Sequence, residues 1–458
     1  MKLMRFLPRF RKAYRMLEML EARESWSRDE IEAFQLDRVN ALWEQASRHV
    51  PYYRTLAAES NLPPRFCSLG EFRATVPVLP KFEVRARRDS FFSEKAERGC
   101  WEFTSGSTGT PTPVYWGKEA KHRTLRAQYR FRAMWGIDIF DRMAVLWGHA
   151  ASFAPGLAGL AARMSMPWRD WLRNWIRLSA YYLGRDDLRQ YLRQIANFRP
   201  AAIYAYSTAA YLLALEAQAT GFTCDSLKMV NLAAEPVFPY MAEAVERAFG
   251  VPAVTEYGSV ECGFLAGEWR DRKLRVREDG VLMETLPRND GRYDIVVSVL
   301  SNPSFPLIRY AIGDVTSAAL EFPERGFAIL TNVTGRYNDL VLSRSGRYIH
   351  PLRLDEVFEH KDGIRRWRVQ QDSSGTLSVV IELHNDEVSI DRGKLVRELE
   401  DVVEGFAVSL QVATTLPKTA AGKHRWITSD LVNQPTHEAT GGIEAPLVQE
   451  SQRSIVDE

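Results

Sequence analysis

The stretch FTSGSTGTPTP, residues 103–113, combines two glycines, two serines and four threonines. Glycine lets backbone N–H groups turn toward one point, and hydroxyls add donors, so such a loop can hold an anion such as a phosphate. It is not a Walker A loop, because Gly109 is followed by Thr110 and Pro111 where that motif needs Lys and then Ser or Thr. A plain hairpin connection of the same composition is the alternative. The rest of the chain has to decide between the two.

Length and composition narrow the class of protein. The chain has 458 residues, which is enough for two or three domains with separate cores. A formal net charge of +2 gives no basic footprint for nucleic acid. The four cysteines lack metal-ligand spacing, and no apolar run reaches the roughly 18 residues that cross a bilayer. We therefore expect a cytoplasmic globular protein without a transmembrane segment.

The N-terminus reads as a basic amphipathic helix. Its apolar residues recur at helical spacing, namely Phe10, Ala13, Tyr14, Leu17 and Leu20. Such a helix could contact an anionic membrane peripherally. The favoured interpretation is a surface helix that docks its apolar stripe on the domain.

The middle of the chain alternates between helices and short apolar strands. Helices are expected at 118–135, 183–200, 208–220 and 238–250, and strands at 142–148, 201–207, 227–236 and 252–258. This alternation is typical of a parallel sheet with right-handed crossovers, which binds ligands beyond the carboxyl ends of its strands. Upstream, residues 27–80 read as helical with a turn at 51–53.

The sequence pattern changes from alternating helices and strands to successive strands after about residue 280. Antiparallel strands are expected at 280–286, 293–301 and 327–335, and a compact α+β unit follows residue 338. That unit contains expected strands at 340–343 and 407–416, helices at 351–360 and 391–405, and a hairpin at 373–375. The polar tail from about residue 431 lacks periodicity and is expected to be disordered.

Together these patterns predict an α/β protein in three parts. The first, residues 1–337, is a large domain of mixed, mostly parallel sheets flanked by helices, with a small antiparallel barrel-like part. The second, residues 338–430, is a small mobile α+β domain, and residues 431–458 form the tail.

Six motifs in order carry a family resemblance. They are TSGSTGTP at 104–111, AAEP at 233–236, EYGSVE at 256–261, YAIGD at 310–314, GRYND at 335–339 and LPKTAAGK at 416–423. This set resembles the adenylate-forming superfamily of acyl-CoA synthetases, peptide-synthetase adenylation domains and luciferases. HVPYYRTL at 49–56, VPVLPK at 76–81 and Ala-Glu-Pro at 234–236 are similar to the phenylacetate–CoA ligase branch and its relatives from capsule-polysaccharide clusters. The resemblance covers roughly residues 45–428 and favours the phosphate-binding interpretation of the loop.

The resemblance implies ATP-dependent activation of a small carboxylic acid. An acyl-adenylate forms, pyrophosphate leaves, and the acyl group passes to CoA as a thioester. Glu261 would bind Mg²⁺, Asp314 the ribose hydroxyls, and Lys423 would join the carboxylate to the α-phosphate, so Lys423, Glu261 and Thr104 are the expected catalytic residues. The nucleotide and CoA positions implied are Thr104, Ser105, Gly106, Ser107, Thr108, Gly109, Ala234, Glu235, Pro236, Tyr257, Gly258, Asp314, Arg336 and Gly346. Asn338 would be the hinge about which the small domain rotates between the two half-reactions.

The acyl pocket is expected around Trp147, His149 and Tyr206. These residues are aromatic, and no Asp is evident to hold an amino group, which favours a hydrophobic or aromatic acid. The segment 166–183 carries three tryptophans at helical spacing, which favours core anchors over a lid or a membrane-facing patch. A zinc site at Cys262 is not expected, because no partner has suitable spacing.

The chain departs from the family pattern at three positions. Val260 stands where relatives carry a hydroxyl near the α-phosphate, which should weaken adenylation by about 1–3 kcal/mol. Asn338 stands where Asp or Lys is usual. Thr112 stands where Lys often ends the loop, but this is as in phenylacetate–CoA ligase relatives, so it does not by itself argue against activity. Two other functions stay open. The acyl acceptor could be a carrier-protein phosphopantetheine or a polysaccharide-pathway group, or the chain could be a degenerate nucleotide-binding homologue.

Overall fold

The structure is a computed structural model. It describes residues 8–104, 112–148, 170–171, 173–180, 183–235, 237, 239–288, 292–331, 333–334, 341–349, 353–354, 357–358, 361, 363–383, 390–413, 416 and 427–431.

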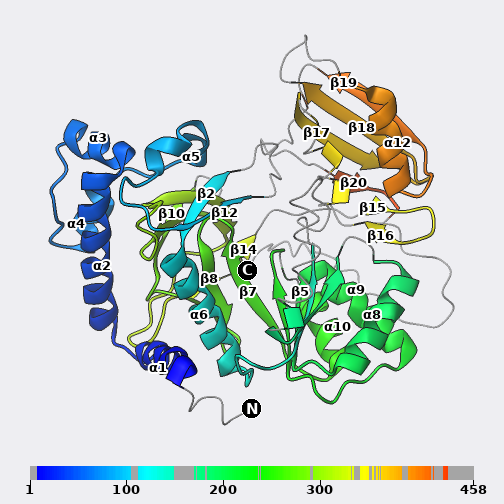
Figure 1. Cartoon of the computed structure of the whole chain (residues 1–458), viewed down its shortest axis with the longest axis horizontal. Coiled ribbons are helices and arrows are strands. Elements are labelled where there is room, and N and C mark those ends of the chain that lie inside the picture. Colours follow the sequence, from blue (N-terminus) through cyan, green and yellow to red (C-terminus); the bar gives the residue numbers. More distant parts are fainter. Residues whose placement is uncertain are drawn as a thin grey trace, which may run out of the picture.

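An eight-stranded sheet forms the centre of the molecule (Figure 1). Its strands run in the order β13-β9-β8-β7-β6-β5-β3-β4, parallel from β7 to β4 and antiparallel from β7 to β13. The strands are β3 (Met143–Trp147), β4 (Trp175–Ser179), β5 (Ala202–Tyr206), β6 (Met229–Ala233), β7 (Ala253–Ser259), β8 (Gly263–Glu268), β9 (Leu274–Val276) and β13 (Ile329–Leu330). The expected α/β alternation is confirmed.

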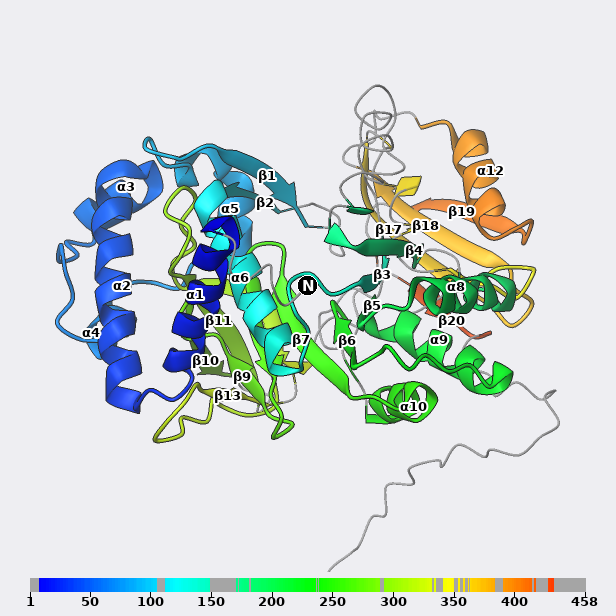
Figure 2. The ribbon, with the colours of Figure 1, turned by 60° about the horizontal axis from the view of Figure 1, so that its bottom comes forward.

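Helices cover both faces of this sheet. On one face, α8 (Arg185–Phe198), α9 (Ser207–Thr220) and α10 (Pro239–Phe249) share a core with alternate strand residues such as Leu146, Ile203 and Leu232. On the other face, α6 (Lys118–Met134) packs Ala127 and Phe131 against Met143, Met229 and Phe264. Figure 2 shows helices α8, α9 and α10 grouped beside β5 and β6.

A second, antiparallel sheet has the order β10-β11-β12-β14. Its strands are β10 (Val281–Pro287), β11 (Tyr293–Val299), β12 (Tyr310–Thr316) and β14 (Val333–Thr334). The N-terminal helices share its core, which contains Trp43, Tyr53 and Tyr310. These helices are α2 (Arg28–His49), α3 (Pro51–Glu59), α4 (Leu69–Thr75) and α5 (Lys81–Ala86), followed by a 3₁₀ turn at Arg88–Phe91.

A smaller sheet of order β19-β18-β17-β20 follows in sequence. Its strands are β17 (Ile364–Gln371), β18 (Leu377–Leu383), β19 (Val408–Ala413) and β20 (Ile427–Ser429). Helix α12 (Arg392–Val402) and a separate hairpin, β15 (Val341–Leu342) and β16 (Tyr348–Ile349), pack with this sheet. These elements share their own core, which includes Val341, Trp367 and Leu399. The hairpin expected at 373–375 is present between β17 and β18.

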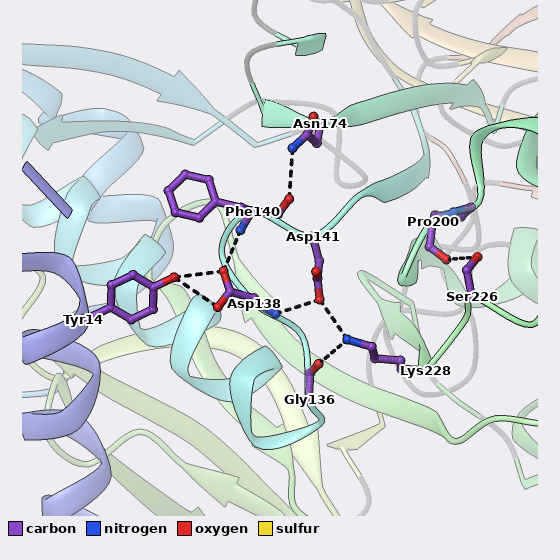
Figure 3. A network of polar contacts seen from close by, with 9 residues as sticks. All are labelled: Tyr14, Gly136, Asp138, Phe140, Asp141, Asn174, Pro200, Ser226 and Lys228. Carbon is purple, nitrogen blue, oxygen red and sulfur yellow. Dashed lines mark hydrogen bonds and ion pairs between the residues drawn. The ribbon is translucent and has the colours of Figure 1, made fainter. Parts of the chain in front are cut away.

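The N-terminal helix α1 (Pro8–Arg23) packs against helix α6, as expected from its apolar stripe. Tyr14 donates to both oxygens of Asp138 at 3.0 and 3.1 Å. Asp138 and Asp141 belong to one polar network that includes Lys228 and closes the turn after α6 (Figure 3). Among the described residues, no helix combines the length and hydrophobicity that a membrane crossing requires.

Three local expectations are wrong. Residues 51–53 begin α3 rather than forming a turn, because Pro51 ends α2 and is well suited to the first helical position. The stretch 327–335, expected as one antiparallel strand, contains two short strands, β13 and β14, which pair antiparallel as expected but join different sheets.

The third concerns the segment 166–183, where the tryptophans at helical spacing predicted core anchors. Its described part contains β4, which pairs with β3. Trp171 is 68% exposed, whereas Trp175 is half-buried and packs against the core that contains Met143, so the core-anchor expectation fails for Trp171 and holds for Trp175. The aromatic and β-branched side chains of Trp175 and Ile176 favour a strand there.

Candidate active site

The Ser/Thr/Gly loop rises from a β-hairpin. Strands β1 (Gly99–Phe103) and β2 (Pro113–Gly117) pair antiparallel, so Thr104 and Thr112 face each other at the hairpin end. The Thr104 N–H donates to the Thr112 carbonyl at 3.2 Å, and the Thr112 N–H donates to the Thr104 hydroxyl at 2.8 Å. A hairpin connection and an anion-binding loop are therefore compatible interpretations, because residues 105–111 connect the two strands of the hairpin in sequence. Residues 105–111, which include Ser105, Gly106, Ser107, Thr108 and Gly109, lie outside the described residues.

Glu261 is a buried carboxylate directly after β7, with 3% of its surface exposed. The turn that carries it is fixed on both sides, because Cys262 N–H donates to Ser259 Oγ at 3.0 Å and Trp116 Nε1 donates to the Val260 carbonyl at 3.0 Å. Ser259 is thus engaged within the turn, and Val260 is partly exposed.

Two groups contact the Glu261 carboxylate. Lys81 Nζ lies 2.5 Å from Oε1, and the Tyr310 hydroxyl donates to the same oxygen at 3.3 Å. Burial, reinforced by Glu261, raises the pKa of Tyr310, so the phenol stays protonated and remains a donor. The buried Glu261 carboxylate is therefore contacted by one cation, Lys81, and one neutral donor, Tyr310.

Helix α5 brings a second cation to the loop. Arg85 Nε donates to Thr112 Oγ1 at 2.8 Å, one helical turn from Lys81, so both side chains leave the same face. The helix is held in place by Leu79, whose N–H donates to Arg309 O at 2.8 Å and whose carbonyl accepts from Ala311 N–H at 2.9 Å.

Sequence reasoning missed Lys81 and Arg85. The available signal was the spacing Lys-x-x-x-Arg directly after VPVLP, which puts two basic side chains on one helical face. The Arg85 contact also bears on the departure at Thr112, because a cation from another element reaches the position where many relatives carry Lys.

Tyr257 and Asp314 meet although they are far apart in sequence. The Tyr257 hydroxyl donates to Asp314 Oδ2 at 2.9 Å. Burial and the adjacent Asp314 raise the pKa of Tyr257 well above its usual value, so this donor is permanent. Gly258 is required beside it, because a Cβ there would lie 2.5 Å from the Gly263 carbonyl oxygen.

The turn after β6 is strained and anchored. Ala234 has φ +68°, a left-handed conformation that is unfavourable for a residue with a Cβ and is characteristic of functional sites. Glu235 Oε2 accepts from Thr208 N–H at 3.0 Å, at the N-terminus of α9, which fixes the turn to that helix. Pro236 lies outside the described residues.

The rings of the expected acyl residues Trp147 and Tyr206 are in contact, with centroids 4.1 Å apart and ring planes tilted by 38°. Trp147 also stacks on Tyr204 at 4.8 Å. His149 lies outside the described residues.

Glu256 shares a sheet face with Tyr206 but already has partners. Gln128 Nε2 and Asn231 Nδ2 donate to it at 2.6 and 2.7 Å, and Arg132 lies 3.7 Å away. This carboxylate is therefore engaged in the core and does not stand open to a substrate amine.

The β15–β16 hairpin, a separate two-stranded sheet that packs with the smaller sheet, approaches helix α8. Gly346 stands at its turn with φ +81°, and the next residue, Arg347, lies 3.7 Å from Asp187 of α8. Arg347 also pairs with Glu404, and a Cβ at Gly184 would overlap its side chain. Arg336, Asn338 and Lys423 lie outside the described residues.

Metal-ligand chemistry is limited in the part of the chain that the structure describes. No group of three or more His, Cys, Asp or Glu side chains is gathered there to hold an ion. Cys262 is buried, and burial raises the pKa of its thiol.

The chain is similar in sequence to known proteins along most of its length. No family model matches the chain. Protein CapK of Staphylococcus aureus is 20% identical over 415 residues, covering 87% of this chain and 89% of CapK. The phenylacetate-coenzyme A ligase of Aromatoleum evansii is 25% identical over 428 residues, covering 87% of this chain and 93% of the ligase.

Solved structures show the same fold. A 2-hydroxyisobutyryl-CoA ligase, crystallised with 2-HIB-AMP and CoA in the thioesterification state, has a TM-score of 0.61 at 21% identity, covering 89% of this chain and 91% of that one. Its postadenylation state gives a TM-score of 0.57 at 19% identity. The chain is thus similar in sequence to CapK and to phenylacetate-coenzyme A ligases, and similar in fold to a 2-hydroxyisobutyryl-CoA ligase.

Proposed function

We propose that the protein is an AMP-forming acid–thiol ligase, which activates a carboxylic acid with ATP and transfers the acyl group to CoA. The observation that carries the proposal is the convergence on one region of Glu261 with Lys81 at 2.5 Å and the hydroxyl-rich hairpin with Arg85. Two anions, a carboxylate and a triphosphate, have to be brought together for this reaction. Buried positive charge and fixed donors are what that step requires.

Glu261 suits a Mg²⁺ ion that is bound jointly with phosphates. Mg²⁺ in nucleotide enzymes takes one or two protein carboxylates and completes its shell with phosphate oxygens and water. Bound there, the ion would neutralise phosphate charge during adenylation. Lys81 holds the carboxylate in place beforehand.

Thr104, the loop residues 105–109 and Arg85 are proposed to hold the β- and γ-phosphates and then the leaving pyrophosphate. Arg85 already donates to Thr112 at the base of the loop, which places its guanidinium charge beside the proposed phosphate site. This arrangement supports adenylation in a chain whose loop lacks Lys at position 112.

Asp314 is proposed to accept the ribose hydroxyls, and Tyr257 with the Ala234–Pro236 turn to enclose the adenine. The hydrogen bond between Tyr257 and Asp314 fixes the carboxylate relative to the ring. Arg336 would contact the ribose and phosphate edge. Retention of Asp314 and Glu261 in these contacts argues against a degenerate homologue.

Lys423 is proposed as the residue that joins the attacking carboxylate to the α-phosphate. The small unit, residues 338–430, would turn about Asn338 after adenylation, withdrawing Lys423 and bringing the Gly346 turn toward the thiol's path. The separate core of that unit supports its movement as one body.

The acid is proposed to be aryl or otherwise hydrophobic, because the rings of Trp147, Tyr204 and Tyr206 form a contiguous aromatic group and Glu256 is already engaged. CoA is the proposed acceptor, and a carrier-protein phosphopantetheine or a polysaccharide-pathway acceptor is the alternative. The protein is proposed to act in the cytoplasm.

A panel of carboxylic acids scored by pyrophosphate release, with and without CoA, tests the proposal. We expect ATP- and Mg²⁺-dependent release with aryl or branched hydrophobic acids, and an acyl-CoA product when CoA is present. Release without any CoA product would favour another acceptor. No release from any acid, with ATP binding intact, would overturn the activity.

A further inference from the structure

A cavity of about 30 Å³ lies between helices α1 and α6 and strands β8 and β9. Figure 2 shows α1 and α6 side by side in this region. The walls of the cavity are largely apolar and include Leu20, Phe131, Met134, Phe264, Trp269 and Phe327. The volume exceeds the roughly 10–15 Å³ that one water molecule needs. None of its lining residues belongs to the nucleotide or acyl positions proposed above.

One side of this cavity is formed by a buried arginine, two of whose nitrogens find no hydrogen-bond acceptor among the described residues. Arg277 is 6% exposed, and among the described residues its Nε and Nη2 atoms have no partner. Gly280 makes room for its guanidinium group, because a Cβ there would lie 2.1 Å from Nη2. A buried guanidinium is normally paired, since removing it from water without an acceptor is costly.

The nearby carboxylates are committed to other arginines. Glu24 binds Arg130 through both oxygens at 2.9 and 2.7 Å, and Asp279 lies 3.6 Å from Arg23.

Glu278 is committed in the same way, since it binds Arg28 at 3.0 and 2.8 Å. Burial lowers the pKa of Arg277, and Arg123 adds to this effect while Asp279 opposes it. Asp279 lines the same cavity and acts on Arg277 through its charge, but neither Nε nor Nη2 of Arg277 finds a hydrogen-bond acceptor in the part of the chain that the structure describes.

We propose that this cavity binds a small organic carboxylate. Its two oxygens accept from the Arg277 guanidinium, a pairing whose geometry matches the arginine fork. Its short hydrocarbon part lies against the aromatic walls, chiefly Phe131, Phe264 and Trp269. The site is separate from the acyl pocket, and the proposal stands whether or not the chain activates acids.

Calorimetric titration of the full chain with acetate, propionate and butyrate tests the proposal. Affinity should rise about fourfold with each added methylene, because each one is removed from water by an apolar wall. Arg277→Met should weaken butyrate binding at least tenfold, and Arg65→Met, at an exposed arginine, should leave it unchanged.

Two further variants separate this site from others. Ala127→Leu keeps Arg277 but fills the cavity, so it should also abolish butyrate binding. Trp147→Ala, in the proposed acyl pocket, should leave this binding event in place. Equal affinity in wild type and Ala127→Leu, or loss of binding in Trp147→Ala alone, would overturn the site. If Arg277→Met does not fold, the Ala127→Leu result decides.

A crystal structure of the full chain with butyrate provides the direct readout. The carboxylate should lie within hydrogen-bond distance of the Arg277 guanidinium. Water alone in the cavity at saturating butyrate would mean that Arg277 is a hydrated core arginine, and the proposal would be wrong.

Discussion

At the scale of single residues, Asp314 and Tyr257 provide a sharp test of nucleotide binding. Asp314→Ala removes the proposed acceptor of the ribose hydroxyls, so ATP affinity should fall about 10- to 100-fold, equivalent to about 1.5–3 kcal/mol for hydrogen bonds to a charged group. Tyr257→Phe is the matched control, because it removes the 2.9 Å hydrogen bond but keeps the ring. Calorimetry with ATP measures both variants, and equal affinity in Asp314→Ala and wild type would contradict the assignment.

Lys81 is the second residue to test. Lys81→Met removes the cation from a 3% exposed Glu261, so pyrophosphate release should slow by about 10²-fold, as expected for loss of one electrostatic contact at a reacting phosphate. Lys81→Arg should recover part of the rate. Lys95→Met, at an exposed lysine, serves as the control. An unchanged rate in Lys81→Met would mean that this lysine only stabilises the fold.

The site residues differ in how well the sequence alone could identify them. Glu261, Tyr257 and Asp314 stand in contiguous motifs, so a reader of the sequence can find them. Lys81 and Arg85 reach the same region from a six-residue helix far upstream, and only tertiary packing of Leu79 on β12 brings them there. No local pattern encodes that contact.

At the scale of elements, the β7–β8 hairpin controls the position of Tyr257. Gly258→Ala would press a Cβ onto the Gly263 carbonyl at 2.5 Å, and backbone cannot yield as a side chain can. We expect a loss of about 1–3 kcal/mol in the free energy of unfolding and weaker ATP binding. Urea denaturation measures the first effect.

Gly70→Ala is the matched control for this element. Gly70 lies in α4, where the nearest atom to an added Cβ is 3.6 Å away, so alanine should stabilise slightly. If the two variants had equal stability, the close approach at Gly258 would not matter.

Elements with strong periodicity were predictable, and the exceptions have physical causes. The helix expected at 118–135 appears as α6, because one apolar face repeats at helical spacing. The Trp/Arg segment was misjudged because aromatic residues suit a strand as well as a helix, and pairing with β3 decides at Trp175–Ser179. Pairing partners are not visible in a local window.

At the scale of the whole molecule, a contact joins the small unit to the large one. Arg347 lies 3.7 Å from Asp187, and both side chains are partly exposed, so the pair is worth at most about 1 kcal/mol. If this contact supports the arrangement used for acyl transfer, Asp187→Asn should slow thioester formation about two- to fivefold. Pyrophosphate release should not change.

Asp186→Asn is the control, since Asp186 is exposed on the same turn of α8. Rapid-quench assays of the two half-reactions distinguish the outcomes. An equal slowing of both steps by Asp187→Asn would show that the residue acts through the stability of α8 instead.

The domain division into 1–337 and 338–430 remains a prediction, and Lys423 offers the most direct measurement of the function proposed for it. Lys423→Ala should fold and bind ATP, yet pyrophosphate release should fall at least 100-fold, or about 3 kcal/mol of transition-state stabilisation. Thioester formation from a presynthesised acyl-adenylate should survive, because the small unit has by then withdrawn the lysine. Stopped-flow measurement of both half-reactions gives the answer. A selective loss of the first step is the predicted result, whereas an equal loss of both steps, or of neither, would contradict adenylate formation by an alternating small domain.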